Sequence, residues 1–210
     1  MADEPVPAKR PNPMRGRVAS KGDTPASSGN VANIVTVLRI LLAPVFIWLL
    51  LTDAGEYGIL RYVAAGLFVL AIVTDSLDGQ LARRRNLVTD AGIILDPIAD
   101  KVLTGGALVA LSILGELPWW ITVVILVREF GITIFRFVWL RRRVIPASRG
   151  GKLKTVLQAV AISLFLVAPW TFLGPWAGWV SWAAMIAALV LTIVTGVEYL
   201  VNAWRSNRTR

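Results

Sequence analysis

Residues 60–82 read LRYVAAGLFVLAIVTDSLDGQLA, an apolar run that ends in two carboxylates. A helix needs about 20 apolar residues to cross the hydrocarbon core of a bilayer, and this stretch has that length. Its last turns carry Asp75 and Asp78, three positions apart. Ionised side chains within or beside a membrane are costly and are usually retained for function. The stretch therefore predicts a membrane helix that ends in a functional site.

Five further apolar segments accompany this one, at residues 34–52, 92–114, 118–140, 153–172 and 177–203. The 56% hydrophobic content is too high for an ordinary soluble domain of 210 residues. We therefore expect an all-α, polytopic membrane protein with six transmembrane helices, its membrane domain spanning residues 31–205. Residues 1–30, rich in Pro, Ala, Ser, Gly and charged residues, predict a disordered basic cytoplasmic tail. Residues 206–210 predict a basic C-terminal tail.

Basic residues gather in the stretches that a six-span threading places on one side of the membrane. These stretches are the N-terminal tail, Arg83–Arg85, Arg141–Lys154 and Arg205–Arg210. The positive-inside rule puts them, and both termini, in the cytoplasm. This placement accounts for the formal charge of +9 without nucleic acid. Tryptophans fall near the opposite face, as an aromatic belt would, at Trp119, Trp120, Trp170, Trp176 and Trp179.

The chain has neither cysteine nor histidine. Disulfides, thiolate zinc sites and cysteine nucleophiles are therefore excluded. Any general base must be a carboxylate, a lysine or a tyrosine. Any metal site must be built mainly from oxygen ligands, which hard ions such as Mg²⁺ or Mn²⁺ prefer.

Four aspartates stand on two consecutive segments. Asp75 and Asp78 are three apart, and Asp96 and Asp100 are four apart, so each pair shares one helix face. A short basic loop joins the two segments, which makes them antiparallel neighbours with the aspartates at similar depth. Four such carboxylates stay ionised together only with cations between them. Two divalent ions there would suit displacement at a pyrophosphate.

Small residues accompany the aspartates at Gly79, Ala82 and Gly92. They would let a ligand approach the helix backbone, although in membrane helices such residues also serve packing. Arg83 offers a fork of donors suited to a phosphate or a nucleotide edge.

These residues form the pattern Asp75-x-x-Asp78-Gly79-x-x-Ala82-Arg83, eight residues, Gly92-x-x-x-Asp96-x-x-x-Asp100. This pattern resembles the full signature of the CDP-alcohol phosphotransferases at every position. Around it, the stretches Asn33–Arg39, Leu95–Lys101, Val127–Phe130 and Ile145–Thr155 resemble the bacterial members that use glycerol 3-phosphate as acceptor.

The resemblance implies a six-helix fold in the bacterial plasma membrane, commonly homodimeric, with a polar cavity open to the cytoplasm. It implies that CDP-diacylglycerol is the donor and that all four aspartates bind a pair of divalent metals. Asp100 would also be the general base. The positions implied for the CDP-lipid are Gly79, Ala82, Arg83, Gly92, Asn33 and Thr36.

The acceptor depends on basic residues outside the signature. Arg128 lies within an apolar segment, where an isolated arginine is expensive unless it faces a polar cavity. Its neighbour Glu129 is not an obvious partner, since adjacent residues of a helix point in different directions. The candidate ligands of the phosphate of glycerol 3-phosphate are Arg39, Arg128, Arg136, Ser148, Lys152 and Lys154.

Two alternatives stay open at this point. Within the family, the acceptor could be inositol phosphate or serine. From a different class, the chain could be a divalent-cation transporter, although it shows no internal repeat and its aspartates sit toward one face of the membrane.

Overall fold

The computed structural model describes residues 31–84, 90–139 and 149–208, with side chains for residues 36–75, 97–135 and 153–202 and for Trp204. The described residues form helices and turns, without a strand. The helices are α1 (Val31–Asp53), α2 (Ile59–Arg84), α3 (Asp90–Ile113), α4 (Trp119–Trp139), α5 (Arg149–Val167), α6 (Trp170–Leu173) and α7 (Pro175–Arg208). The expected all-α fold is confirmed. The tail at residues 1–30 lies outside the described residues.

The six apolar segments correspond to the six long helices, with ends that differ by a few residues. The fifth is the exception, because it was expected to run from 153 to 172 and α5 ends at Val167. Ala168 follows with a φ of +50°, and Pro169 then precedes the short α6. Proline has no backbone N–H and disfavours a helical residue before it, so the helix breaks here. The uninterrupted fifth segment was therefore wrong, and Pro169 was the signal against it.

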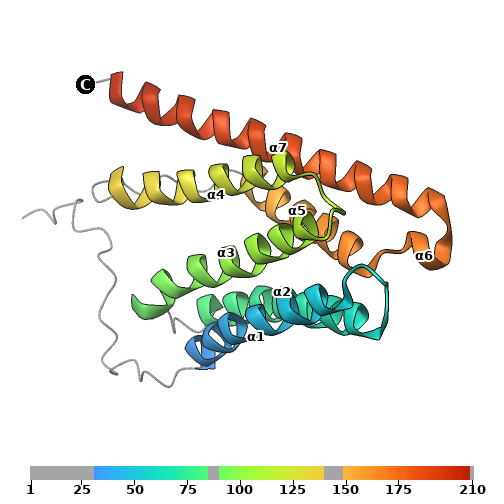
Figure 1. The fold of residues 1–210 in the computed structure, drawn as a ribbon. Coiled ribbons are helices and arrows are strands. Elements are labelled where there is room, and N and C mark those ends of the chain that lie inside the picture. Colours follow the sequence, from blue (N-terminus) through green and yellow to red (C-terminus); the bar gives the residue numbers. More distant parts are fainter. Residues whose placement is uncertain (1–30, 85–89, 140–148, 209–210) are drawn as a thin grey trace, which may run out of the picture.

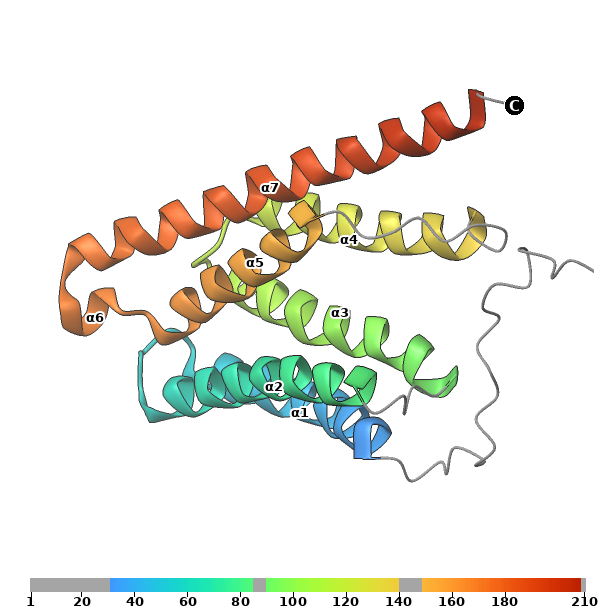
Figure 2. The same ribbon diagram turned by 180° about the vertical axis from the view of Figure 1, so that it is seen from behind.

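Helix α1 packs against both α2 and α3, α5 packs against α2, α3 and α7, and α4 contacts α3 and α7. Both views place the start of α1 and α3 at the same end of the bundle as the last residues of α2, α4 and α7 (Figures 1 and 2). The short helix α6 lies at the opposite end. The antiparallel directions of α2 and α3 expected from their short connection are confirmed, and each of the two helices packs against α1.

The core is apolar, and all six long helices contribute side chains to it. Phe46 of α1 meets Phe68 of α2 edge-to-face, with ring centroids 5.6 Å apart. Leu103, Leu108 and Leu111 of α3 are buried against this pair and its neighbours. A polar contact between helices joins Ser112 of α3 to Thr122 of α4, whose hydroxyl oxygens are 2.7 Å apart.

Arg61 is fully buried in the first turn of α2, and α2 begins at the α6 end of the bundle (Figure 1). Its guanidinium donates to both carboxylate oxygens of Glu116, at 2.6 and 2.5 Å. It also donates to the carbonyls of Phe165 and Leu166, at 2.8 and 2.9 Å, and lies over the ring of Tyr57. In the six-span threading Arg61 falls on the side opposite the basic stretches, and its charge is neutralised inside the protein by Glu116. It ties α2 to the connection between α3 and α4 and to the end of α5.

The outer surface of the bundle is also apolar. Ile59, Trp48 and Trp179 are 79%, 65% and 79% exposed, and many aliphatic side chains on the other helices are exposed with them. Soluble monomers rarely present contiguous apolar patches of this extent. Within the part of the chain that the structure describes, Thr36–Asp53 and Pro175–Asn202 are long and apolar enough to cross a membrane. A helical protein with such a surface is suited to lipid, and the number of six spans stays a prediction.

Candidate active site

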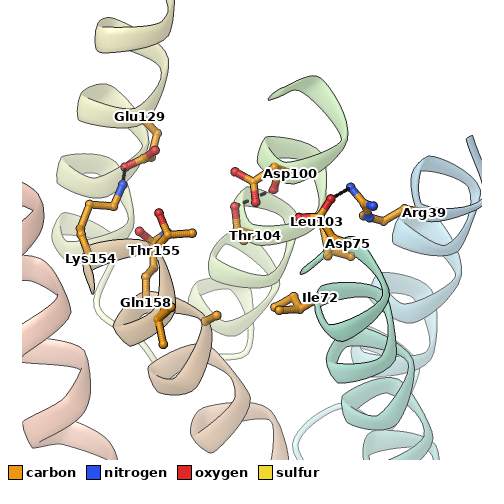
Figure 3. A pocket seen from close by; sticks show the side chains of 12 residues that line it. Arg39, Ile72, Asp75, Asp100, Leu103, Thr104, Glu129, Lys154, Thr155 and Gln158 are labelled. Carbon is orange, nitrogen blue, oxygen red and sulfur yellow. Dashed lines mark hydrogen bonds and ion pairs between the residues drawn. The ribbon is translucent and has the colours of Figure 1, made fainter. Parts of the chain in front are cut away.

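A pocket of about 90 Å³ opens among α1, α2, α3, α4 and α5. Figure 3 shows its polar side chains facing one another across the space between these helices. The lining residues are Arg39, Ile72, Asp75, Asp100, Leu103, Thr104, Glu129, Lys154, Thr155, Val156, Gln158 and Ala159. It is therefore an ionic pocket inside an otherwise apolar bundle.

One wall of the pocket is an ion pair between α1 and α2. Arg39 Nη1 lies 2.6 Å from Asp75 Oδ1. The arginine side chain is 4% exposed, whereas the aspartate side chain is 44% exposed. The guanidinium of Arg39 is therefore buried behind Asp75, whereas the carboxylate of Asp75 remains accessible from the pocket.

Asp100 of α3 lies between this wall and the opposite one (Figure 3). One helical turn later, the hydroxyl of Thr104 donates to the backbone carbonyl of Asp100 at 2.7 Å. That hydrogen bond orients the Thr104 side chain and does not involve the carboxylate of Asp100, which faces the pocket. Asp75 and Asp100, predicted from separate helices, therefore meet at one site.

The opposite wall is built around Glu129 of α4. Its Oε1 accepts from the ammonium of Lys154 on α5 and, at 3.0 Å, from Nη1 of Arg128. Its Oε2 lies 3.7 Å from the ammonium of Lys101 on α3. The expectation that Arg128 and Glu129 are not partners was wrong. Long side chains bend enough for sequence neighbours to meet when other groups hold both of them.

Arg128 itself does not line the pocket. Its Nε donates to the carbonyl of Thr192 at 3.1 Å, and Nη2 donates to Oγ1 of Thr195 at 2.9 Å. Both partners belong to α7, so Arg128 joins α7 to α4 directly behind Glu129. Its direct binding of an acceptor phosphate stays a prediction.

Other predicted site residues are only partly placed. Thr36 is buried on α1, three residues before Arg39. The described side chains do not include Asn33, Asp78, Gly79, Ala82, Arg83, Gly92, Asp96, Arg136 or Lys152, although helices α1–α5 contain all of these positions. Ser148 lies outside the described residues. Asp78 and Asp96 follow and precede the two described aspartates by one helical turn on the same helices.

Sequence reasoning missed several lining residues. Glu129 could have been predicted as a site residue, because a carboxylate in an apolar segment is as costly as the arginine beside it. No such signal marked the other polar lining residues, Thr104, Thr155 and Gln158. A single polar residue in a membrane helix commonly forms a hydrogen bond with a backbone group of its own helix, so it does not by itself indicate a site.

The pocket's donor set fits a hard divalent cation. Asp75 and Asp100 contribute carboxylate oxygens from two helices, and such oxygens are the ligands that Mg²⁺ and Mn²⁺ prefer. Lys154 and Arg39 add positive charge on the two walls. A site of this kind, in a helical bundle with an apolar exterior, belongs to a membrane protein that handles anionic groups such as phosphates.

Comparison with known proteins agrees with this class. Residues 29–194 match the family model for CDP-alcohol phosphatidyltransferase, and the chain belongs to that family. A Mycobacterium tuberculosis protein named "Probable phosphatidylglycerophosphate synthase" is 46% identical over 196 residues, covering 92% of this chain and 88% of that protein. A Bacillus subtilis protein named CDP-diacylglycerol–glycerol-3-phosphate 3-phosphatidyltransferase is 36% identical over 193 residues, covering 86% and 98%. One of the same name from Rickettsia typhi is 36% identical over 180 residues, covering 81% and 94%.

Proposed function

We propose that this chain transfers the phosphatidyl group of CDP-diacylglycerol to glycerol 3-phosphate, giving phosphatidylglycerophosphate and CMP. The observation that carries the proposal is the meeting of Asp75 and Asp100 in one pocket with Lys154, in a member of this family. Relatives that share more than a third of their residues with it carry the names of this enzyme. The reaction belongs to phospholipid biosynthesis.

The proposed setting is the bacterial plasma membrane, crossed six times, with both termini and the pocket on the cytoplasmic side. Three kinds of observation support it: the apolar exterior, the one-sided basic stretches and the gathering of the aspartate-bearing helix ends at one end of the bundle. Residues 1–30 and 206–210 would be basic tails beside anionic headgroups, and the working form would be a homodimer.

On the donor side, two divalent ions would be held by Asp75, Asp78, Asp96 and Asp100. When bound, Mg²⁺ or Mn²⁺ supplies charge neutralisation at the pyrophosphate. The CDP moiety would lie along the helix faces that carry the small residues of the signature, with Arg83 donating to it. The proposed CDP-lipid positions are Gly79, Ala82, Arg83, Gly92, Asn33 and Thr36.

On the acceptor side, the dianionic phosphate of glycerol 3-phosphate would meet the cationic wall of α4 and α5. On that wall, Lys154 lines the pocket, and it is one of the residues predicted to bind the acceptor phosphate. Arg39 stands on the other wall, paired with Asp75. The proposed phosphate ligands remain Arg39, Arg128, Arg136, Ser148, Lys152 and Lys154.

In the proposed step, Asp100 takes the proton of the primary hydroxyl of glycerol 3-phosphate. The hydroxyl oxygen attacks the lipid-side phosphorus, and a new P–O bond forms. The bond between that phosphorus and the bridging oxygen breaks, and CMP leaves with that oxygen. Asp100 then returns the proton to water. Positioning of the two substrates and stabilisation of the developing charge supply most of the rate gain.

Replacement of Asp100 by Asn tests the base assignment. General-base catalysis contributes roughly 10²–10⁴-fold, so CMP release should fall by at least about a hundredfold in purified, folded protein. Asp53→Asn is the matched control, because Asp53 caps the backbone of Tyr57 and Gly58 at the other end of the bundle. That variant should keep near-normal turnover. Substantial turnover by Asp100→Asn would sink the role given to Asp100.

The acceptor is tested on the wild-type protein. Incubation with CDP-diacylglycerol and glycerol 3-phosphate, serine or inositol phosphate in turn, followed by mass spectrometry of the lipid product, identifies the alcohol used. Phosphatidylglycerophosphate should form with glycerol 3-phosphate, and the other two alcohols should give little product. Preferential formation of another phospholipid would overturn the acceptor proposed here.

A further inference from the structure

Glu129 is a single anion among three cations. Lys154 and Arg128 donate to its Oε1, and Lys101 lies 3.7 Å from its Oε2. The three cations come from α3, α4 and α5, so this carboxylate is the point at which these helices are joined electrostatically. Neither the signature of aspartates nor the proposed reaction step gives it a role.

The cluster is largely buried. The side chain of Glu129 is 14% exposed, that of Lys101 is 12% exposed and that of Lys154 is 5% exposed. An ammonium withdrawn from water needs a counter-ion, and breaking such a pair by removing one partner is strongly unfavourable. Lys154 therefore depends on Glu129 to remain at the pocket wall. These four side chains together carry an excess of positive charge, which suits an anionic phosphate, and Asp100 lines the same pocket beside them.

Glu129 is itself held in place from behind. Arg128, which donates to it, is fixed to Thr192 and Thr195 of α7. Gly196 of α7 lies against the same arginine, since a Cβ there would come within 3.2 Å of Arg128 Cγ. Arg128 therefore restricts the movement of the Glu129 carboxylate, and the carboxylate in turn contacts Lys154 at the pocket wall (Figure 3).

We propose that Glu129 is a positioning residue for the acceptor: it holds Lys154 in place so that the phosphate of the acceptor meets a preformed cationic wall. The inference rests on the proposed function and adds the residue that organises the acceptor side of that site. Glu129 touches neither reacting atom. It acts through Lys154, and its loss affects the acceptor far more than the donor.

Charge alone predicts the opposite sign. Removing an anion beside a phosphate site strengthens the site's field and should lower the KM for the acceptor. Positioning predicts a higher KM, because three cations without their carboxylate repel one another and Lys154 leaves its buried place. The two explanations are therefore separated by the direction of a single kinetic change.

The experiment compares Glu129→Gln with wild-type protein in mixed micelles, measuring KM for glycerol 3-phosphate and for CDP-diacylglycerol by CMP release. The KM for glycerol 3-phosphate should rise at least about tenfold, the worth of a hydrogen bond to a charged group, and that for the CDP-lipid should change less than about threefold. Glu116→Gln is the control, since it breaks a buried ion pair at the other end of the bundle. It should leave the ratio of the two KM values unchanged.

Lys154→Gln shows whether Glu129 acts through the lysine. If it does, the double variant Glu129→Gln/Lys154→Gln should have about the KM for glycerol 3-phosphate of Lys154→Gln alone. If the glutamine variant does not fold, Glu129→Asp replaces it, because it keeps the charge and withdraws the carboxylate by one methylene. That variant should also raise the KM for the acceptor.

Three results would overturn the inference: a lower or unchanged KM for glycerol 3-phosphate, equal changes in both KM values, or independent effects that multiply in the double variant. Failure of the proposed function is a separate outcome, seen in wild-type protein as the absence of phosphatidylglycerophosphate. A wild type that makes this product while Glu129→Gln keeps normal KM values refutes the positioning role alone.

Discussion

Arg61 and Lys154 are both cations buried in an apolar bundle, and their surroundings differ in one respect. Arg61 is enclosed by Glu116 and two backbone carbonyls at the α6 end. Lys154 has its carboxylate partner on one side and the pocket on the other. A buried charge whose partners are all protein groups stabilises the fold, whereas one that faces a pocket can bind a ligand.

Removal of Arg61 should therefore destabilise the protein without changing its chemistry. Arg61→Met leaves Glu116 without its counter-ion and two carbonyls without donors, which costs about 3–5 kcal/mol for a buried pair. The midpoint of thermal unfolding in detergent should fall clearly. The double variant Arg61→Met/Glu116→Met should recover much of the loss, because no unpaired charge remains. An unchanged midpoint in the single variant would contradict this account.

At this scale the sequence predicted the aspartates better than their neighbours. The spacing within the signature defines helix faces, and one aspartate from each pair, Asp75 and Asp100, lines the same pocket. The surroundings of Arg128 could not be predicted, because helical periodicity says which residues share a face and not which helix lies opposite. Its contacts with Thr192 and Thr195 join segments 64 and 67 residues apart. The cost of a carboxylate in an apolar segment pointed to Glu129, but its partners Lys101 and Lys154 lie on other helices and could not be predicted from spacing.

The elements were predictable to the extent that each is decided by local composition. Long apolar runs can satisfy their backbone in lipid only as helices or closed barrels, which explains why the six segments became helices. The break before α6 also depends on local sequence, because Pro169 predicts the end of a helix. The packing of α7 against α4 could not be predicted from local composition, because it depends on the contact of Gly196 with the side chain of Arg128.

Gly196 tests that packing. A Cβ at this position would lie 3.2 Å from Arg128 Cγ and 3.4 Å from its Nε, so Gly196→Val must displace the arginine or separate α7 from α4. We expect a loss of about 1–3 kcal/mol, as for other overpacked sites, and a higher KM for glycerol 3-phosphate. Thermal unfolding and CMP release measure the two effects.

Gly66 of α2 provides the matched control for this substitution. A Cβ there would meet nothing within 4 Å, so Gly66→Val adds the same side chain at an open position. Its unfolding midpoint and its KM for the acceptor should both stay close to those of wild-type protein. Similar losses in both variants would mean that valine disturbs any helix here, and the α4–α7 contact would lose its special role.

For the molecule as a whole, two distributions determine how it would sit in a bilayer. Apolar side chains cover the outside along the helices. Exposed tryptophans stand near the α6 end at Trp119, Trp120, Trp176 and Trp179, and Trp204 is exposed near the other end, on the last turns of α7. Trp170, expected with the first four, instead packs on Phe165 with ring centroids 5.8 Å apart. The ends of α2 and α7, which the basic stretches of the sequence adjoin, lie at the opposite end of the bundle, and the positive-inside rule predicts that this end faces the cytoplasm.

The absence of cysteine makes this orientation directly measurable, because any introduced thiol is the only one in the chain. Three single variants suffice: Glu56→Cys between α1 and α2, Asn86→Cys in the basic stretch after α2, and Asn202→Cys near the end of α7. In spheroplasts, a membrane-impermeant maleimide should label only Glu56→Cys. The other two should react after permeabilisation. Asn86 decides the number of spans, because a chain crossing only through α1 and α7 would leave it outside. External labelling of Asn86→Cys would therefore contradict the six-span arrangement while leaving the pocket's chemistry untouched.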